Sequence, residues 1–356
     1  MNARNLIDLD HISQNDLEEV IRLAGIIKEN PSYYIDDCHG NIMATLFYEP
    51  STRTQMSFQT AMLRLGGKLI GFDNPSNSSV SKGESLKDTI RVVSNYADII
   101  VIRNSFEGAA LAASMYSRCP IINAGDGGHL HPTQTLTDLV TLSYEKGRLD
   151  HLTVGLCGDN KNGRTVHSLI KALSKYEGNR FVMISTPELR VPDYIIEHLK
   201  ETGSEFLFAD NLEDAISGLD VLYMTRIQRE RFASQREYEA QKGVFVLDEN
   251  KMKLAKSDLR VLHPLPRVDE ITVGVDDDPR AKYFEQTEYG MYARMALIIK
   301  MLENRNSRLP DKVCSTHDCK CTNLRCITQT EEYLPSIFKE TDEYLVCRYC
   351  EHTMRK

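Results

Sequence analysis

The chain has 356 residues, of which 41% are hydrophobic, and this is enough for two domains of ordinary size and a small appendage. Its formal net charge of −8, from 43 basic and 51 acidic residues, argues against a general nucleic-acid-binding protein but does not exclude an anionic substrate. The sequence contains no apolar stretch of about 18 residues and no signal-peptide apolar region, so we expect a cytoplasmic protein without a membrane span.

Short β-type runs alternate with helical patterns along most of the chain. The strands predicted in the first half are Ile42–Tyr48, Lys68–Phe72, Asp98–Arg103 and Pro120–Asn123. Those predicted in the second half are Leu152–Cys157, Phe181–Ser185, Glu205–Ala209, Val221–Thr225, Val244–Leu247 and Arg260–Leu262. Because nearly continuous apolar strands alternate with amphipathic helices, we predict an α/β fold with two doubly wound parallel-sheet domains.

The expected junction between the two domains is the helical segment 133–146 and the turn Gly147-Arg148-Leu149-Asp150 that follows it. We therefore place the first domain at residues 1–146 and the second at 147–287. A helix predicted at 288–306 would complete the first domain. Residues 307–311 are typical of a linker, and residues 312–356 would form a separate cysteine-rich module.

The segment Ser51-Thr52-Arg53-Thr54 follows the first predicted strand and precedes residues with helical spacing. Hydroxyl residues that open a helix gather free backbone N–H groups and the positive end of the helix dipole at one point. Arg53 adds a planar fork of donors that suits phosphate or carboxylate. The segment therefore predicts an anion-binding site, and the alternative is an ordinary helix N-cap.

Four further segments place polar or basic residues where predicted strands end, which is where ligands bind in open α/β sheets. They are Arg103, His131-Pro132-Thr133-Gln134, Tyr223-Met224-Thr225-Arg226-Ile227-Gln228 and His263-Pro264-Leu265-Pro266-Arg267. Singly, Arg103 could be a surface salt bridge and His131 could bond a loop carbonyl. Together the segments favour a ligand site. The polar segment around Lys82 indicates either a lid that brings a cation to the ligand or a mobile surface loop.

In order and approximate spacing, the motifs that begin at Ser51, His131, Tyr223 and His263 resemble those of the catalytic chain of the aspartate carbamoyltransferase family. The resemblance covers roughly residues 4–306. It implies transfer of a carbamoyl group from carbamoyl phosphate to L-aspartate, the committed step of pyrimidine synthesis. It implies no cofactor for the reaction itself.

The resemblance also implies which residues bind the substrates. The set for carbamoyl phosphate is Ser51, Thr52, Arg53, Thr54, Arg103, His131, Gln134, Leu265 and Pro266. The set for aspartate is Lys82, Arg164, Thr165, Arg226 and Gln228. Ser79 and Lys82 would reach the active site of a neighbouring subunit, which implies a homotrimer. Glu49 would pair with Arg164 and Arg231 when the two domains close.

The catalytic residues that the resemblance implies are Arg53, Thr54, Arg103 and His131. Once the aspartate amine attacks the carbamoyl carbon, Thr54, Arg103 and His131 could donate to the developing oxyanion, where one donor is typically worth ~3–4 kcal/mol. Holding two anionic substrates together would contribute a further ~7–11 kcal/mol through orientation. Gln55 departs from the family pattern, which often has a basic residue at this position.

Two other functions remain as alternatives. A sister transferase would use ornithine or another amine, but ornithine enzymes typically carry His-Cys-Leu-Pro where this chain has His263-Pro264-Leu265-Pro266. Arg226 also suits a second carboxylate better than a cationic side chain. A zinc-ribbon nucleic-acid-binding protein would need a basic surface, whereas the middle of the tail is acidic.

Cysteine usage separates the tail from the rest of the chain. Cys38, Cys119 and Cys157 are scattered among apolar or small residues, as buried thiols are. Six more fall between residues 314 and 350, in the pattern Cys314-x4-Cys319-x-Cys321-x4-Cys326 followed by Cys347-x2-Cys350. In a cytoplasmic protein such a cluster indicates a metal site, and its spacing fits four thiolates on one zinc ion.

The spacing alone leaves open which four cysteines bind the zinc. The segment around Cys321 and Cys326, with the final pair, resembles the zinc domain of the same enzyme's regulatory chain, which implies Cys321, Cys326, Cys347 and Cys350. Cys314 and Cys319 are then spare, although with His317 they offer a competing set. The nucleotide-binding domain of that regulatory chain is missing, so nucleotide feedback does not follow. Our hypothesis is that the fused zinc module docks on a catalytic domain and ties subunits or trimers together.

Overall fold

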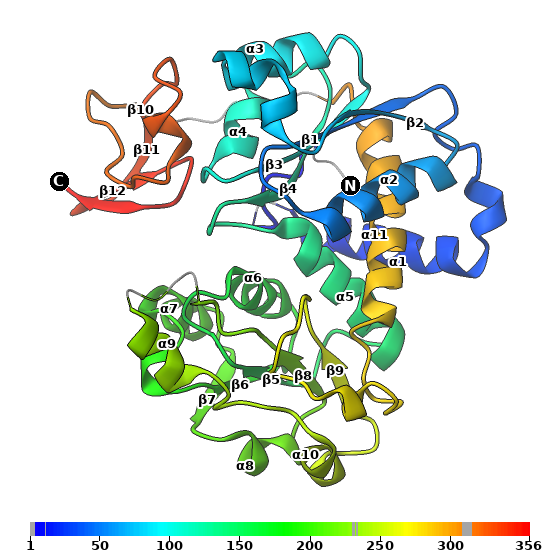
Figure 1. Cartoon of the computed structure of the whole chain (residues 1–356), viewed down its shortest axis with the longest axis vertical. Helices are drawn as coiled ribbons and strands as arrows, with labels where there is room; N and C mark the ends of the chain where they lie inside the picture. The colour runs from blue at the N-terminus through cyan, green and yellow to red at the C-terminus, as the bar shows by residue number, and fades with distance from the viewer. Residues whose placement is uncertain (1–3, 11, 230–231, 233, 308–314) are drawn as a thin grey trace. The chain divides into compact units, whose positions relative to one another are not determined.

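The computed structural model describes residues 4–10, 12–229, 232, 234–307 and 315–356 (Figure 1). The chain divides into two compact units, Met1–Thr133 with Met291–Lys356, and Gln134–Gly290. The division falls within two helices, α5 (Pro132–Lys146) and α11 (Glu285–Glu303). None of the described helices has the length and apolar character that are needed to cross a membrane.

The first unit is built on a four-stranded sheet in which neighbouring strands run parallel. The strand order is β2 (Lys68–Phe72), β1 (Ile42–Phe47), β3 (Ile99–Asn104) and β4 (Ile121–Asp126). β3 and β4 are buried along their whole length, as expected for apolar strands that are covered on both faces. Chain order reverses between β1 and β3, so the switch point of this sheet lies at their carboxyl ends.

Helices and short 3-10 turns precede or connect these strands. They are α1 (Gln14–Glu29), η1 (Pro31–Tyr34), α2 (Thr52–Arg64), η2 (Pro75–Asn77), η3 (Ser79–Lys82), α3 (Leu86–Val93) and α4 (Ala109–Ser114). α3 is amphipathic: Leu86, Thr89 and Ile90 face the core, and Ser85 caps its start by accepting from Asp88 N at 3.1 Å. α4 is short and alanine-rich, which allows close packing on both sides.

The second unit contains a five-stranded parallel sheet. Its order is β7 (Glu205–Ala209), β6 (Arg180–Ile184), β5 (Thr153–Cys157), β8 (Val221–Met224) and β9 (Arg260–Leu262). Its helices and turns are α6 (Arg164–Leu173), η4 (Pro187–Leu189), α7 (Asp193–Glu201), α8 (Leu212–Ile216), α9 (Gln235–Gln241), α10 (Glu249–Leu254) and η6 (Val273–Val275). The switch point of this sheet lies between β5 and β8.

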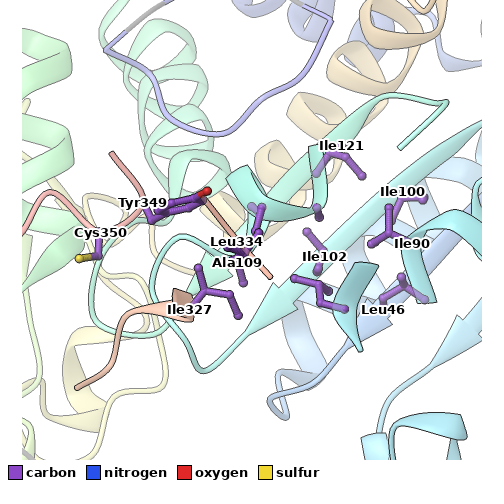
Figure 2. Packing of buried hydrophobic residues seen from close by; sticks show 14 of the residues in the cluster. Leu46, Ile90, Ile100, Ile102, Ala109, Ile121, Ile327, Leu334, Tyr349 and Cys350 are labelled. Atoms are coloured by element: carbon purple, nitrogen blue, oxygen red, sulfur yellow. The ribbon is translucent and has the colours of Figure 1, made fainter. Parts of the chain in front are cut away.

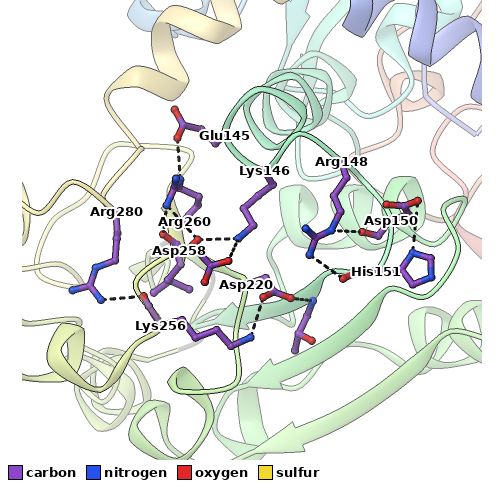
Figure 3. A network of polar contacts seen from close by, with 12 residues as sticks. Glu145, Lys146, Arg148, Asp150, His151, Asp220, Lys256, Asp258, Arg260 and Arg280 are labelled. Carbon is purple, nitrogen blue, oxygen red and sulfur yellow. Dashed lines mark hydrogen bonds and ion pairs between the residues drawn. The ribbon is translucent and has the colours of Figure 1, made fainter.

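Ion pairs hold the carboxyl end of α5 against the second sheet (Figure 3). Arg260, the first residue of β9, donates through Nε to Glu145 Oε2 at 2.9 Å. Lys146 Nζ lies 2.8 Å from Asp258 Oδ2, on the turn before β9. Both contacts join the end of α5 to the start of β9 or the turn before it, and so they fix this end of α5 to the second sheet.

The predicted α/β class with two parallel sheets is confirmed, but one of the ten predicted strands is wrong. In the described residues, Val244–Leu247 forms no strand, and only Leu247 makes an isolated parallel bridge, to Ile271. Phe245 and Leu247 are nevertheless buried in the core of the second unit. Their apolar character therefore reflects packing of a loop and not pairing along a ladder.

The remaining part of the chain, residues 315–356, is called here the C-terminal module. Its sheet is antiparallel and follows chain order through β10 (Ser315–Thr316), β11 (Ile337–Glu340), β12 (Tyr344–Cys347) and β13 (Thr353–Arg355), with the turn η7 (Ile327–Gln329). The segment 308–314, which includes Cys314 and most of the predicted linker, lies outside the described residues.

The C-terminal module shares a hydrophobic core with the first unit (Figure 2). Ile327, Leu334 and Tyr349 are buried in one cluster with Ala109 of α4 and Ile102 of β3. Backbone bonds reinforce this contact, because Glu107 N donates to the Arg325 carbonyl at 2.8 Å and Ile327 N donates to the Glu107 carbonyl at 2.9 Å. The module is therefore an integral part of the first unit.

Candidate active site and metal centre

The predicted anion segment lies between β1 and α2, at the switch point of the first sheet. Ser51 occupies the N-cap position of α2, and Arg53 and Thr54 lie in its first turn. Among the described residues, the Ser51 hydroxyl donates to Thr54 Oγ1 at 3.1 Å and does not accept from an N–H of the helix. Ser51 is therefore not an ordinary side-chain cap, and the start of α2 keeps the donors that suit an anion.

Arg103 lies near the carboxyl end of β3, at the same switch point, with 8% of its surface exposed. Its Nη2 is 3.0 Å from Glu49 Oε2, and its Nη1 donates to the Ala124 carbonyl at 3.1 Å. Burial lowers the pKa of Arg103, and the neighbouring Glu49 carboxylate opposes that shift. Arg103 is thus a buried, positioned guanidinium, which excludes the alternative of a surface salt bridge.

Gly125 lies between Arg103 and His131. It has a φ of 118°, and an added Cβ would lie 2.6 Å from Arg103 Nη1 and 3.6 Å from Cδ2 of His131. Only glycine allows both this backbone conformation and the close approach of the guanidinium. His131 is buried, and its Nδ1 lies 3.4 Å from Thr133 Oγ1. The structure therefore brings the predicted residues Arg103 and His131 to one place.

The turn that precedes His131 is organised around the buried carboxylate of Asp126, which accepts from Gly108 N at 2.8 Å and from Leu130 N at 2.9 Å. His129 connects this turn to the C-terminal module, since its Nδ1 is 3.1 Å from Asp126 Oδ2 and its Nε2 is 3.4 Å from Glu351 Oε2. Burial opposes a charge on the ring, but Asp126 and then Glu351 raise the pKa of His129 to about 10. The protonated His129 ring thus bridges the carboxylates of Asp126 and Glu351.

The predicted lid residues Ser79 and Lys82 lie on the short turn η3 and are exposed. The Ser78 hydroxyl accepts from Val80 N at 3.3 Å at the start of this turn, and Gly83, with a φ of 88°, ends it. Gly83 N donates to the Val80 carbonyl at 2.9 Å. The segment is therefore a compact turn that holds a lysine toward solvent.

The predicted aspartate-binding residues of the second unit lie at the switch point of the second sheet. These residues are Arg164, Thr165, Arg226 and Gln228, and all four are half-buried. Arg164 begins α6 after β5, and Arg226 follows β8. Thr225 holds the two strand ends together, because its hydroxyl donates to the Cys157 carbonyl and accepts from Asp159 N, each at 3.0 Å. Arg231, which with Arg164 is a predicted partner of Glu49, lies outside the described residues.

A buried hydrogen-bond network fixes the side chain of Gln134. Asp138 lies one turn further along α5 and is fully buried. Its Oδ1 accepts from Gln134 Nε2 at 2.8 Å and from Gln286 Nε2 at 2.6 Å, and its Oδ2 accepts from the Tyr223 hydroxyl at 3.0 Å. Because the amide nitrogen of Gln134 is held in this way, its carbonyl oxygen is directed elsewhere and can accept a hydrogen bond from a ligand.

The same network reaches the segment that contains Leu265. Gln286 Oε1 accepts from His263 N at 3.0 Å. Leu265 N donates to His263 Nδ1 at 2.7 Å, so this nitrogen is unprotonated and Nε2 carries the proton, which it donates to Glu270 Oε1 at 2.6 Å. Burial is the largest single effect and raises the pKa of Glu270, but the interactions with His263 and the backbone N–H bonds together outweigh it and leave the pKa below its usual value. Leu265, with a φ of 51°, and the cis peptide to Pro266 are held by this bonded turn.

The four cysteines that the sequence resemblance selects come together in the C-terminal module. The sulfurs of Cys321, Cys326, Cys347 and Cys350 all lie within 4.8 Å of one another and are buried. Two of the pairs measure 3.6 and 3.9 Å, close to the edge of about 3.8 Å that a tetrahedron with Zn–S bonds of about 2.3 Å requires. Cys319 is exposed and lies outside the cluster.

Hydrogen bonds among the four thiols divide their pKa values: those of Cys321, Cys347 and Cys350 are raised and that of Cys326 is lowered, so without a metal ion the cluster favours a single thiolate. Hydrogen bonds from the other three cysteines, Cys321 above all, lower the pKa of Cys326. The Thr328 hydroxyl adds a further bond to Cys326 Sγ at 3.2 Å. A bound zinc ion would crosslink the segment that carries Cys321 and Cys326 to the end of β12 and the turn after it, and it would take no part in catalysis.

Sequence reasoning missed the residues that support the motif residues, namely Asp138, Gln286, Glu270 and His129. Asp138 carried a signal, since it lies four residues after Gln134 on a predicted helix, where side chains meet. Gln286 carried none, because its partners Asp138 and His263 are distant in sequence, and His129 and Glu270 carried none, because their contacts depend on how irregular turns fold.

Comparison with known proteins agrees with these motifs. Residues 4–144 match the carbamoyl-P binding domain of the aspartate/ornithine carbamoyltransferase family, and residues 150–301 match its Asp/Orn binding domain. Residues 316–356 match the metal binding domain of the aspartate carbamoyltransferase regulatory chain. Both predicted resemblances are confirmed, and with the four-sulfur cluster the last match also confirms the predicted structural zinc site.

Individual relatives are similar over nearly their whole length. The chain is 60% identical over 302 residues to the aspartate carbamoyltransferase catalytic subunit of Clostridium novyi, covering 85% of this chain and 99% of that protein. The catalytic subunit of M. jannaschii aspartate transcarbamoylase is 48% identical with a TM-score of 0.81, covering 86% of this chain and all of that one. Aspartate transcarbamoylase from Trypanosoma cruzi, solved with carbamoyl phosphate and aspartate, is 37% identical with a TM-score of 0.77, covering 83% of this chain and 94% of that one.

Proposed function

The chain belongs to the aspartate/ornithine carbamoyltransferase family, and on that premise we propose that it carries out aspartate carbamoyl transfer. The reaction takes the carbamoyl group of carbamoyl phosphate to the amine of L-aspartate and releases N-carbamoyl-L-aspartate and phosphate. One observation supports this proposal above all: each sheet carries arginines at its switch point, Arg53 and Arg103 on the first and Arg164 and Arg226 on the second. Two anionic substrates need two such cationic sites.

In the first unit, the phosphate of carbamoyl phosphate would bind at Ser51, Thr52, Arg53 and Thr54, with Arg103 beside them. The helix N-terminus and the two guanidinium groups balance the phosphate charge. Glu49 occupies one side of Arg103 at 3.0 Å. A bound phosphate would therefore compete with Glu49 for the guanidinium, which frees the carboxylate for its proposed partners Arg164 and Arg231.

The reacting carbamoyl group would be held by His131, Gln134 and the Leu265–Pro266 segment. When the aspartate amine attacks the carbamoyl carbon, negative charge develops on the carbamoyl oxygen. Thr54, Arg103 and His131 would donate to that oxygen, and each well-placed donor lowers the barrier by ~3–4 kcal/mol. The C–O bond to phosphate then breaks, and the departing phosphate accepts the proton that the amine loses.

The two carboxylates of aspartate would bind Arg164 and Arg226, helped by Thr165, Gln228 and Lys82. Two cationic groups favour a dicarboxylate over ornithine, whose side chain carries a positive charge. The aspartate carbamoyltransferase name of the Clostridium relative supports the same choice.

The domain and assembly assignments are part of the proposal. Residues 1–146, completed by the helix near 288–306, would bind carbamoyl phosphate, and residues 147–287 would bind aspartate. Ser79 and Lys82, which are exposed on η3, would complete the site of a neighbouring copy in a homotrimer. The reaction would serve pyrimidine synthesis in the cytoplasm. Cys321, Cys326, Cys347 and Cys350 would bind one zinc ion, and the C-terminal module would link subunits or trimers.

A direct assay tests the function. Purified zinc-loaded protein is incubated with carbamoyl phosphate and either L-aspartate or L-ornithine, with Arg53→Ala as the active-site control. We expect carbamoylated product with aspartate alone and at least a hundredfold loss in the variant. Product with ornithine instead would show that Arg226 and the second site have been misassigned.

A further inference from the structure

The C-terminal module supplies hydrogen-bond acceptors to the start of α3. The first N–H groups of a helix have no partner within the helix and must be bonded from elsewhere. Here Leu86 N donates to Glu331 Oε1 at 3.0 Å, and Lys87 N donates to the Tyr333 hydroxyl at 2.8 Å. The helix's own cap, Ser85, satisfies only the next N–H group, that of Asp88. Two residues 245 and 246 positions away in the sequence thus complete the cap of α3.

The contact between the module and the start of α3 also includes aromatic and cationic side chains. The Lys87 ammonium lies 5.4 Å from the Tyr116 ring and 5.2 Å from the Tyr333 ring, and the two rings meet edge to face at 5.7 Å. Leu334, next to Tyr333 in sequence, is buried in the core that the module shares with the first unit. A carboxylate at this end of the helix also interacts favourably with the helix dipole, and Glu331 supplies one.

The start of α3 is in turn the anchor of the turn that holds Lys82. Only Gly83, Glu84 and Ser85 separate Lys82 from the helix. Glu84 Oε2 accepts from the Thr89 hydroxyl of α3 at 2.8 Å, and Glu84 N donates to the Ser79 carbonyl at 3.4 Å. The first turn of α3 therefore sets the point from which the segment Ser79–Lys82 extends.

We propose that Glu331 is a positioning residue for the reaction: by capping α3 it holds Lys82 where a substrate carboxylate or phosphate meets it. This inference rests on the proposed function, because it takes Lys82 as a substrate-binding residue. It also gives the fused module a role in substrate affinity that its zinc site alone does not have.

The test compares Glu331→Ala, Glu331→Gln and the control Glu332→Ala in the full-length, zinc-loaded protein. Glu332 is adjacent and exposed, so its loss removes the same charge without the cap. We expect Glu331→Ala to lower kcat/KM about tenfold, corresponding to about 1.4 kcal/mol, mainly by raising KM. Glu331→Gln should recover part of this loss because its amide oxygen can still accept from Leu86 N. Glu332→Ala should stay within twofold of the unchanged protein.

A double-mutant cycle with Lys82→Ala separates positioning from general destabilisation. If Glu331 acts through the turn that holds Lys82, its removal should cost less than about twofold once Lys82 is absent. A full additional tenfold loss in that background would overturn the proposal. Tyr333→Phe, which removes only the hydroxyl that accepts from Lys87 N, provides a milder variant with the same expected dependence on Lys82.

Hydrogen exchange of the backbone amides of residues 79–87 gives a readout that does not depend on turnover. Exchange should quicken in Glu331→Ala and stay unchanged in Glu332→Ala. Equal exchange in the two variants would refute the capping role even if activity falls. An unchanged protein that fails to carbamoylate aspartate would refute the proposed function instead, and the exchange data would still decide whether Glu331 orders this segment.

Discussion

Replacing Asp138 should be among the most damaging single changes in the second unit. Its carboxylate is fully buried and accepts three hydrogen bonds, from the amides of Gln134 and Gln286 and from the hydroxyl of Tyr223. Asp138→Ala removes both carboxylate oxygens, so the buried side chains of Gln286 and Tyr223 and the half-buried side chain of Gln134 lose their acceptor. Asp138→Asn keeps one acceptor oxygen for the two amides, and the Tyr223 hydroxyl can rotate to accept from the new amide.

The expected change in the free energy of unfolding follows from these hydrogen bonds. A buried donor left without its partner costs ~1–3 kcal/mol. Removal of the carboxylate also relieves the cost of burying a charge, so the three penalties do not add in full. We therefore expect Asp138→Ala to lower the free energy of unfolding by about 3–5 kcal/mol, the range found when one partner of a buried ionic network is removed. Asp138→Asn should cost about 1–2 kcal/mol, since charge assistance is lost but the bonds are not.

Urea unfolding followed by far-ultraviolet circular dichroism measures this loss. The matched control is Asp277→Ala, an exposed aspartate of the same unit, which should stay within about 0.5 kcal/mol. Activity gives a second measure, because Gln134 would lose the bond that orients it and KM for carbamoyl phosphate should rise. A shift for Asp138→Ala no larger than that of Asp277→Ala would refute the view that this network organises the second unit.

Three further predictions concern the first unit. Arg103→Lys should lower kcat/KM at least a hundredfold, since a lysine cannot reproduce the planar fork, and steady-state kinetics at saturating aspartate would show it. Chelation of zinc, or Cys326→Ser, should unfold the C-terminal module and expose part of the shared core, detected by limited proteolysis that releases the tail while the second unit stays intact. Because the pKa of His129 is raised from 6.5 to about 10, its contribution to stability should be complete below about pH 6.5 and lost as pH rises through about 10. The difference in unfolding midpoint between the unchanged protein and His129→Gln should therefore shrink across that window, and a difference that grows with pH would contradict the pairing with Asp126 and Glu351.

The local sequence pattern is sufficient to predict the bounds of a strand that pairs along its whole length. Lys68–Phe72, Glu205–Ala209 and Arg260–Leu262 were predicted with the bounds that the structure shows. Val244–Leu247 has the same apolar character, but whether it pairs depends on the segment beside it, and that segment contributes only Ile271. A strand forms only when two segments pair, and the local pattern of one segment does not show whether a partner lies beside it.

The same limit separates motif residues from the residues that support them. Arg103 and His131 could be found because parallel strands end on one edge, so a polar residue at a strand end points to the site. Asp138 and Gln286 are 148 positions apart, and Glu331 and Leu86 are 245 positions apart. No periodicity links such pairs, and only the folded chain shows that they meet.

The contact between the C-terminal module and the first unit also explains a residue of the first unit itself. Gly108 precedes α4 with a φ of 85°, and a Cβ at this position would lie 2.5 Å from Cβ of Tyr349, which stands between two of the clustered cysteines. The backbone of Gly108 also donates to Asp126, in the turn before His131. Glycine is thus required where the module, α4 and the His131 turn converge. The backbone at Gly108 is therefore adapted to the packing of the module, and we expect loss of the zinc site to perturb the conformation of the turn before His131.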